Sequence, residues 1–100
     1  YNVDGRGNGV AAMIYGPDTV IVVAGINKIC ENLEAAIRRN QTVSAPKNAA
    51  RLHKNTPCVH TGECMHCLSK DRICASFVVL GPQMIPNRIK VLLVGECLGY

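Results

Sequence analysis

Cysteine spacing is the feature that most constrains this 100-residue sequence. Four of its six cysteines fall within 17 residues, at Cys58, Cys64, Cys67 and Cys74. The central Cys-x-x-Cys pair can bring two sulfurs onto one metal through a tight turn, and the two flanking cysteines complete a four-thiolate shell. The segment therefore predicts an iron–sulfur cluster or a zinc ion bound by these four side chains.

Two other interpretations of the cysteine segment stay open. An even number of cysteines in a short chain is also typical of a disulfide framework, and thiols can remain reduced as small structural side chains. Long β-branched runs elsewhere in the chain disfavour a disulfide-stapled miniprotein, which usually lacks them. His53, His60 and His66 are near enough in sequence to replace one cysteine ligand.

The other two cysteines, Cys30 and Cys97, are expected in the core. Free cysteine is often buried as a small hydrophobic residue. Cys30 falls in a predicted helix, and Cys97 follows a predicted buried strand. A thioredoxin-type redox pair at Cys64 and Cys67 is disfavoured, because no strand precedes it.

Composition excludes several classes of function. The net charge is +4, but no three of the eleven basic residues are consecutive, and only four residues are aromatic. Neither a basic patch nor base-stacking side chains are therefore expected, and we predict no nucleic-acid partner. The apolar runs are far shorter than the roughly 20 residues that cross a bilayer. We expect no membrane association and a cytoplasmic location.

Hydrophobic patterning predicts an α/β fold. Residues 19–24 form a β-branched run typical of a strand buried on both faces in a parallel sheet. Asn27 is placed to cap a helix from Lys28 to about Arg39, whose apolar residues recur at helical spacing. Residues 2–9 are predicted as a turn-rich loop. The remaining predicted elements are helices over 10–15, with Asn8 as a cap, and 47–52, and strands over 75–80 and 88–94.

Ligands of open α/β sheets bind beyond the carboxyl ends of the strands. Asn27 and Lys28 follow the first predicted strand, Glu96 follows the last, and Asn8 lies in a glycine-rich loop before a helix. These four residues are our candidates for binding a small ligand or coenzyme. The simpler interpretation is that Asn27 only caps a helix and Glu96 is only a surface acid.

Several motifs along the chain resemble the LUD domain of lactate-utilization proteins. The similarity covers residues 2 to 100, and one departure is Gly9, where the family pattern has arginine after the asparagine at position 8. An anion contact made by that arginine would be missing in this chain. The motifs that carry the resemblance are Asp4-Gly5 with Asn8, Val10 to Pro17, Val22 to Ile29, Thr56-Pro57-Cys58, Thr61-Gly62 with Cys64, Asp71 to Cys74, Val94-Gly95-Glu96 and Leu98 to Tyr100.

The resemblance implies a Rossmann-like, mostly parallel sheet flanked by helices, similar to the isomerase and coenzyme A transferase group. Residues 1–100 would be the C-terminal part of a LUD domain of about 200 residues, with a cysteine-rich segment over 56–75. Such a partial domain agrees with the small number of predicted strands. It also implies an accessory or electron-transfer role in the oxidation of lactate or a related organic acid. The partners would be lactate-oxidation subunits or a second copy of the chain. A ligand- or coenzyme-binding enzyme domain with a structural cysteine clip is the alternative.

Overall fold

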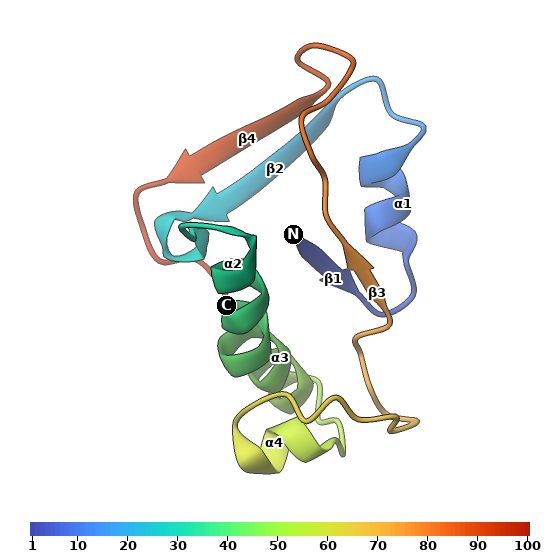
Figure 1. The fold of residues 1–100 in the computed structure, drawn as a ribbon, viewed down its shortest axis with the longest axis vertical. Coiled ribbons are helices and arrows are strands. Elements are labelled where there is room, and N and C mark those ends of the chain that lie inside the picture. The colour runs from blue at the N-terminus through green and yellow to red at the C-terminus, as the bar shows by residue number, and fades with distance from the viewer.

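A computed structural model describes all 100 residues, and its helices and strands are short. Figure 1 shows two pairs of strands with a helical arm that runs away from them. In chain order the elements are β1 (Asn2–Asp4), α1 (Asn8–Ile14), β2 (Val20–Gly25), the 3₁₀ turn η1 (Ile26–Lys28), α2 (Leu33–Arg39), the π turn η2 (Asn40–Ser44), α3 (Ala45–Arg51), α4 (Pro57–Thr61), β3 (Ser76–Val78) and β4 (Ile89–Val94).

The parallel pair β2–β4 confirms the strands predicted over 19–24 and 88–94. Val22 lies opposite Val91, and Val23 lies opposite Leu92. β-Branched side chains favour this extended backbone because they pack well on a pleated surface. The expectation that the first strand is buried on both faces is wrong, since Ile21 and Val23 are each 60% exposed.

The antiparallel pair β1–β3 was not predicted from sequence. Residues 2–9 were expected to be a loop, yet β1 pairs with β3 from Asn2 opposite Val78 to Asp4 opposite Ser76. The predicted strand over 75–80 is confirmed in this shorter form. The mixed α/β class is confirmed, but the strands form two separate pairs instead of one mostly parallel sheet.

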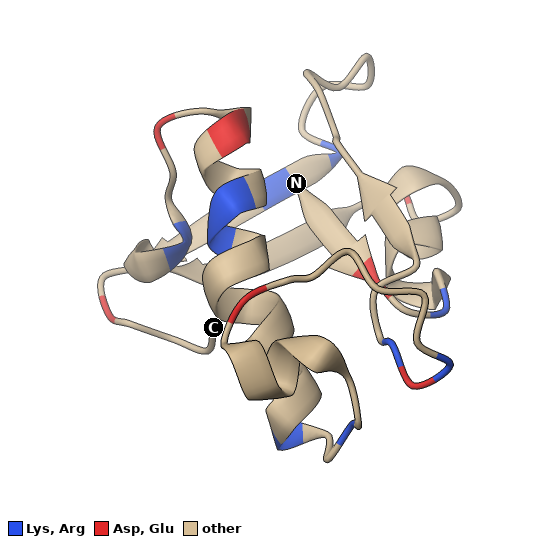
Figure 2. Ribbon diagram, turned by 60° about the horizontal axis from the view of Figure 1, so that its bottom comes forward, with Lys and Arg blue, Asp and Glu red and all other residues tan.

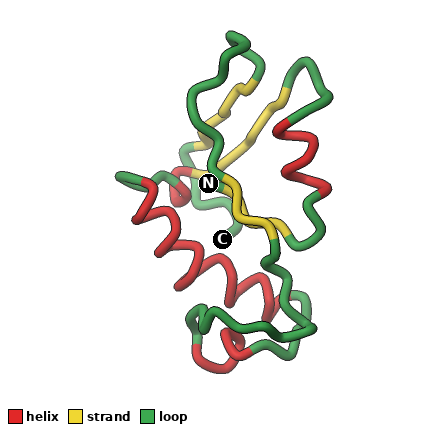
Figure 3. Tube along the Cα trace, turned by 45° about the vertical axis from the view of Figure 1, so that its right-hand side comes forward, coloured by secondary structure: helices red, strands yellow, loops and turns green.

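Helices α2 and α3 form one arm, joined by the π turn η2, as the tube in Figure 3 shows. The predicted helix begins five residues later than expected, because the Asn32 side chain, and not that of Asn27, caps it by accepting the Ala35 N–H at 2.8 Å. Pro46 stands in the first turn of α3 and cannot donate to the carbonyl four residues before it. The wider π turn accommodates this proline, and the predicted helix over 47–52 is confirmed as α3.

Helix α1 confirms the helix predicted over 10–15, but its cap differs. Gly7 holds the N-cap position in a left-handed conformation, with φ of 82°, and Asn8 is the first helical residue. The Asp4 carboxylate closes the preceding turn by accepting backbone N–H groups, from Arg6 and Gly7 at 2.9 Å and from Gly9 at 3.0 Å. The start of α1 is therefore held by Asp4.

Little of the chain is buried. Six residues are buried, among them Val10, Ala49 and Thr56. The accessible surface is 7204 Å², against about 5,500 Å² expected for a compact monomer of this mass. The radius of gyration is 14.3 Å, against about 13 Å expected for 100 residues. Figure 2 shows lysine and arginine scattered over loops, strands and the helical arm instead of gathered on one face. None of the helices combines the length and the apolar character that crossing a bilayer requires.

Candidate functional site

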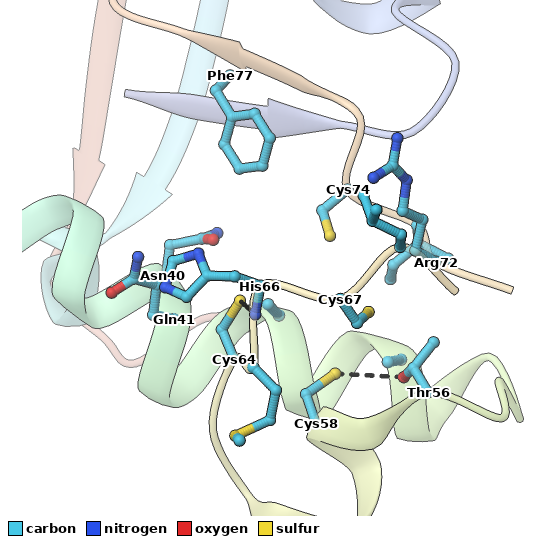
Figure 4. Close-up of a pocket in the computed structure, with 15 residues that line it drawn as sticks. Asn40, Gln41, Thr56, Cys58, Cys64, His66, Cys67, Arg72, Cys74 and Phe77 are labelled. Carbon is cyan, nitrogen blue, oxygen red and sulfur yellow. Dashed lines mark hydrogen bonds between the residues drawn. The ribbon is translucent and has the colours of Figure 1, made fainter. Parts of the chain in front are cut away.

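All four cysteines singled out by their spacing line one cavity. It has a volume of about 210 Å³ and lies between the helical arm and the segment that leads from α4 to β3. Figure 4 shows Cys74 reaching it from the strand side, whereas Cys58, Cys64 and Cys67 approach from the side of α4. The structure therefore brings together thiols that come from α4, from the loop after it and from the residues just before β3.

Helix α4 orients the first cysteine. Thr56 precedes the helix, is 2% exposed, and places its hydroxyl 3.2 Å from the Cys58 sulfur. Pro57 suits the first helical turn, where its missing N–H costs nothing. Gly62 ends the helix with φ of 80°, a left-handed conformation that favours glycine. Because of this turn, the residues after α4 return toward the cavity.

The loop after α4 is pinned to the π turn. The Cys64 N–H donates to the Gln41 carbonyl at 2.8 Å. The His66 backbone N–H points at the Cys64 sulfur, 3.5 Å away, and His66 adopts a left-handed φ of 49° that is uncommon for a non-glycine residue. His66 lines the cavity, whereas His53 and His60 do not. Of the three histidines, only His66 is placed to join the cysteines.

A small hydrogen-bonded turn fixes the chain before the last cysteine. The Asp71 carboxylate accepts the Asn55 N–H at 2.8 Å, and the Ser69 hydroxyl accepts the Asp71 N–H at 3.2 Å. Arg72, next to this turn, lines the cavity beside Cys74. Sequence analysis did not find these contacts, because they join residues up to 16 positions apart through a loop.

The thiols are close enough to influence one another. Burial raises the pKa of Cys74, the charges of Cys64, Cys67 and Cys58 raise it further, and Arg72 acts in the opposite direction. Burial also raises the pKa of the Tyr1 phenol, as do the charges of Cys64 and Cys74.

All six cysteines are free thiols, so the disulfide interpretation of the segment finds no support in the structure. No three of the histidine, cysteine or acidic side chains are gathered tightly enough to hold a single metal ion. The prediction that Cys97 is buried is wrong, since it is exposed, and Cys30 is half-buried in the loop before α2 instead of lying in a helix.

The four candidate ligand-binding residues lie in two places. Asn27, Lys28 and Glu96 follow the adjacent ends of β2 and β4. The Asn27 side chain donates to the Gly99 carbonyl and accepts the Leu98 N–H, both at 3.1 Å, so it holds the C-terminal segment. The Glu96 carbonyl accepts the Ile26 N–H at 3.2 Å, and Glu96 is exposed. Asn8 lies elsewhere, at the start of α1 beside Asp4.

The family model of the LUD domain matches residues 1–94, which include the whole cysteine segment. The chain belongs to the LUD domain family. No curated protein and no solved structure matches it. The match to the family model confirms the resemblance inferred from the sequence motifs.

The LUD-domain chain has a structural reason for glycine at position 9, its departure from the family pattern. A Cβ atom built on Gly9 would lie 2.8 Å from the Asp4 carboxylate, closer than Cβ atoms approach other atoms in proteins. The same carboxylate accepts the Gly9 N–H. A larger residue would therefore displace the Asp4 carboxylate from the hydrogen bonds that close the turn before α1, and glycine leaves room for them.

Proposed function

We propose that this LUD-domain chain binds an iron–sulfur cluster through Cys58, Cys64, Cys67 and Cys74. We further propose that it serves as an accessory or electron-transfer component in the oxidation of lactate or a related organic acid. The observation that carries the first proposal is the convergence of these four thiols on one cavity from three parts of the chain. The family name supports the second.

The arrangement of the sulfurs favours a cluster over a zinc ion. Four thiolates around one zinc, each about 2.3 Å from it, stand about 3.8 Å from one another. No three of the candidate ligands here are gathered around such a point, although all four thiols line the cavity. In a cluster each thiolate can ligate a different iron, so the sulfurs stand farther apart. When bound, the group would supply one-electron transfer.

Several groups near the thiols would offset the negative charge of a thiolate set. No aspartate or glutamate lines the cavity, and Arg72 is its one cationic side chain. The His66 N–H directed at the Cys64 sulfur would stabilise a thiolate there, because hydrogen bonds to ligand sulfurs lower their electron density. Thr56 is placed to do the same for Cys58. These residues would tune the reduction potential without ligating iron.

The exposed sheet supports a proposal about partners. Ile21, Val23 and Leu92 are more than half exposed on β2 and β4. Apolar surface of this kind marks an interaction site. We propose that lactate-oxidation subunits or a second copy of the chain cover it, and that β2–β4 belongs to a larger, Rossmann-like sheet. Free thiols of this number suit a reducing compartment, which supports a cytoplasmic location.

Replacing each cysteine separately tests the proposal. Four Cys→Ser variants, at positions 58, 64, 67 and 74, are purified anaerobically and analysed for iron. Each is expected to lose most of its bound iron, whereas Cys97→Ser, a matched change at an exposed thiol outside the cavity, keeps it. Equal iron content in all five variants would exclude these cysteines as ligands. Circular dichroism confirms that each variant is folded.

The electron-transfer role has a separate test. The wild-type protein is mixed anaerobically with lactate and the lactate-oxidation subunits, and its visible absorption is followed. Reduction of the cluster in the complete mixture, but not when lactate is omitted, is expected. A cluster that dithionite reduces and the complete mixture leaves oxidised would refute this role while leaving the cluster itself in place.

A further inference from the structure

A second cavity, distinct from the cysteine cavity, lies between the helical arm and the end of β2. Its volume is about 270 Å³, and its lining includes Lys28, Arg39, Ser44 and Asn48. Two of these side chains carry a positive charge, and no aspartate or glutamate lines the cavity. The side chains that line it therefore carry a net positive charge.

Arg39 is held rigidly at this cavity. Its Nε donates to the Asn27 carbonyl at 2.9 Å, and its Nη1 donates to the Ser44 hydroxyl at 3.0 Å. These two bonds fix the plane of the guanidinium and leave Nη2 without a protein partner. A guanidinium fixed in this way is prepared for a planar oxyanion, because little side-chain freedom remains to be lost on binding.

The π turn and the first turn of α3 supply the neutral polar groups. Ser44 and Asn48 both line the cavity, and the Asn48 side chain donates to the Ser44 backbone carbonyl at 2.9 Å. Asn40, the first residue of η2, lines this cavity and the cysteine cavity alike. π turns are frequent at functional sites, because they displace side chains from the regular helical positions. The two cavities thus share Asn40 as a lining residue.

We propose that this second cavity binds a small oxyanion, the carboxylate or phosphate group of a metabolite, through Lys28 and Arg39. Arg39 gives directional hydrogen bonds, and Lys28, which is exposed at the rim, gives a mobile charge. The site goes beyond the proposed function and needs no metal. Because Asn40 lines both cavities, the anion would bind near the cysteine cavity.

Isothermal titration of the full chain tests the proposal. Lactate, pyruvate and inorganic phosphate are the probes, and chloride at equal ionic strength is the reference. At least one probe is expected to bind saturably. Saturation by the carboxylates alone identifies a carboxylate ligand, and saturation by phosphate alone identifies a phosphate ligand. The absence of saturable binding by all three probes would overturn the proposal.

Two variants show whether the binding is specific. Lys28→Gln removes the rim charge and is expected to weaken binding at least tenfold, since a charged hydrogen bond is lost. Lys90→Gln makes the same charge change on the exposed face of β4, outside the cavity, and is expected to bind as the wild type does. Equal weakening in both would show nonspecific attraction and overturn the site.

Arg39→Lys keeps the positive charge but loses the planar set of N–H donors of the guanidinium. It is also expected to weaken anion binding at least tenfold. Unchanged affinity in this variant would exclude Arg39 from the site. Iron content is measured on the same samples. A protein that binds iron and no anion refutes only this inference, and one that binds an anion and no iron refutes only the proposed function.

Discussion

Arg88 is the residue whose replacement best tests how α1 is held to the β2–β4 pair. It stands just before β4, is 8% exposed, and reaches two other parts of the chain. Its Nε donates to the Pro17 carbonyl at 3.1 Å, and its Nη1 donates to the Met13 carbonyl at 2.8 Å. It thus connects the C-terminal end of α1 and the loop before β2 to the start of β4.

The cost of removing Arg88 follows from these contacts. Two hydrogen bonds from a charged donor contribute about 1.5–3 kcal/mol each. Nη2 is buried with no partner, and this unpaired group together with the buried charge costs roughly 1–3 kcal/mol. Arg88→Met keeps the packing of the aliphatic stem but leaves both carbonyls without donors. We expect it to lower the free energy of unfolding by about 2–3 kcal/mol.

Urea unfolding followed by circular dichroism measures the effect. With a slope of about 1.5 kcal/mol per M, the midpoint should fall by about 1–2 M. Lys90→Met, two residues further along the chain and exposed, is the control and should change the free energy of unfolding by no more than about 0.5 kcal/mol. If Arg88→Met were as stable as the wild type, the free-energy cost of burying the guanidinium charge would equal the contribution of its two hydrogen bonds. That result would refute the reasoning.

Three further changes test other contacts of the fold. Gly25→Ala would place a Cβ atom 2.5 Å from the Glu96 carbonyl oxygen, so we expect a loss of at least about 2 kcal/mol in urea unfolding; wild-type stability would contradict the close approach of the strand ends. Asn32→Ala removes the cap of α2 and should cost about 0.5–2 kcal/mol, measured in the same way; no loss would place the cap elsewhere. The hydrogen bond from the Gly7 amide is the largest of the effects that lower the pKa of Asp4 below its ordinary value of 3.8. The stability that the ionised Asp4 carboxylate provides is therefore complete above the unfolded-state pKa. It is lost as the pH falls through the lower folded-state pKa. The stability difference between the wild type and Asp4→Asn should hold from pH 7 to about 5 and shrink below about 4; a difference independent of pH would refute this.

Local sequence patterns predicted the elements that residue propensity alone favours. The β-branched runs became β2 and β4, and the alanine-rich stretch before Tyr15 became α1. Helix α2 shows where such prediction stops. Both Asn27 and Asn32 are chemically able to cap a helix, but Asn27 is engaged with Leu98 and Gly99. A contact across more than 70 residues decided the boundary, and no local pattern contains that information.

The candidate site was predicted in part. Cysteine spacing was sufficient to group the four thiols, because ligands of one site recur at short intervals along a loop. The residues that orient them were not foreseen. The contact from Cys64 to Gln41 depends on the π turn, and that turn follows from Pro46 within an otherwise continuous helix. Lys28 was among the predicted ligand-binding residues, but the cavity that it shares with Arg39 was not predicted, because the π turn shapes that cavity.

Iron and inorganic sulfide, measured together in the anaerobically purified wild-type protein, test the central claim most directly. The account predicts equal amounts of iron and inorganic sulfide, with a broad visible absorption that dithionite bleaches. Neither iron nor sulfide in a folded protein with all six thiols free would contradict it, as would one zinc ion per chain.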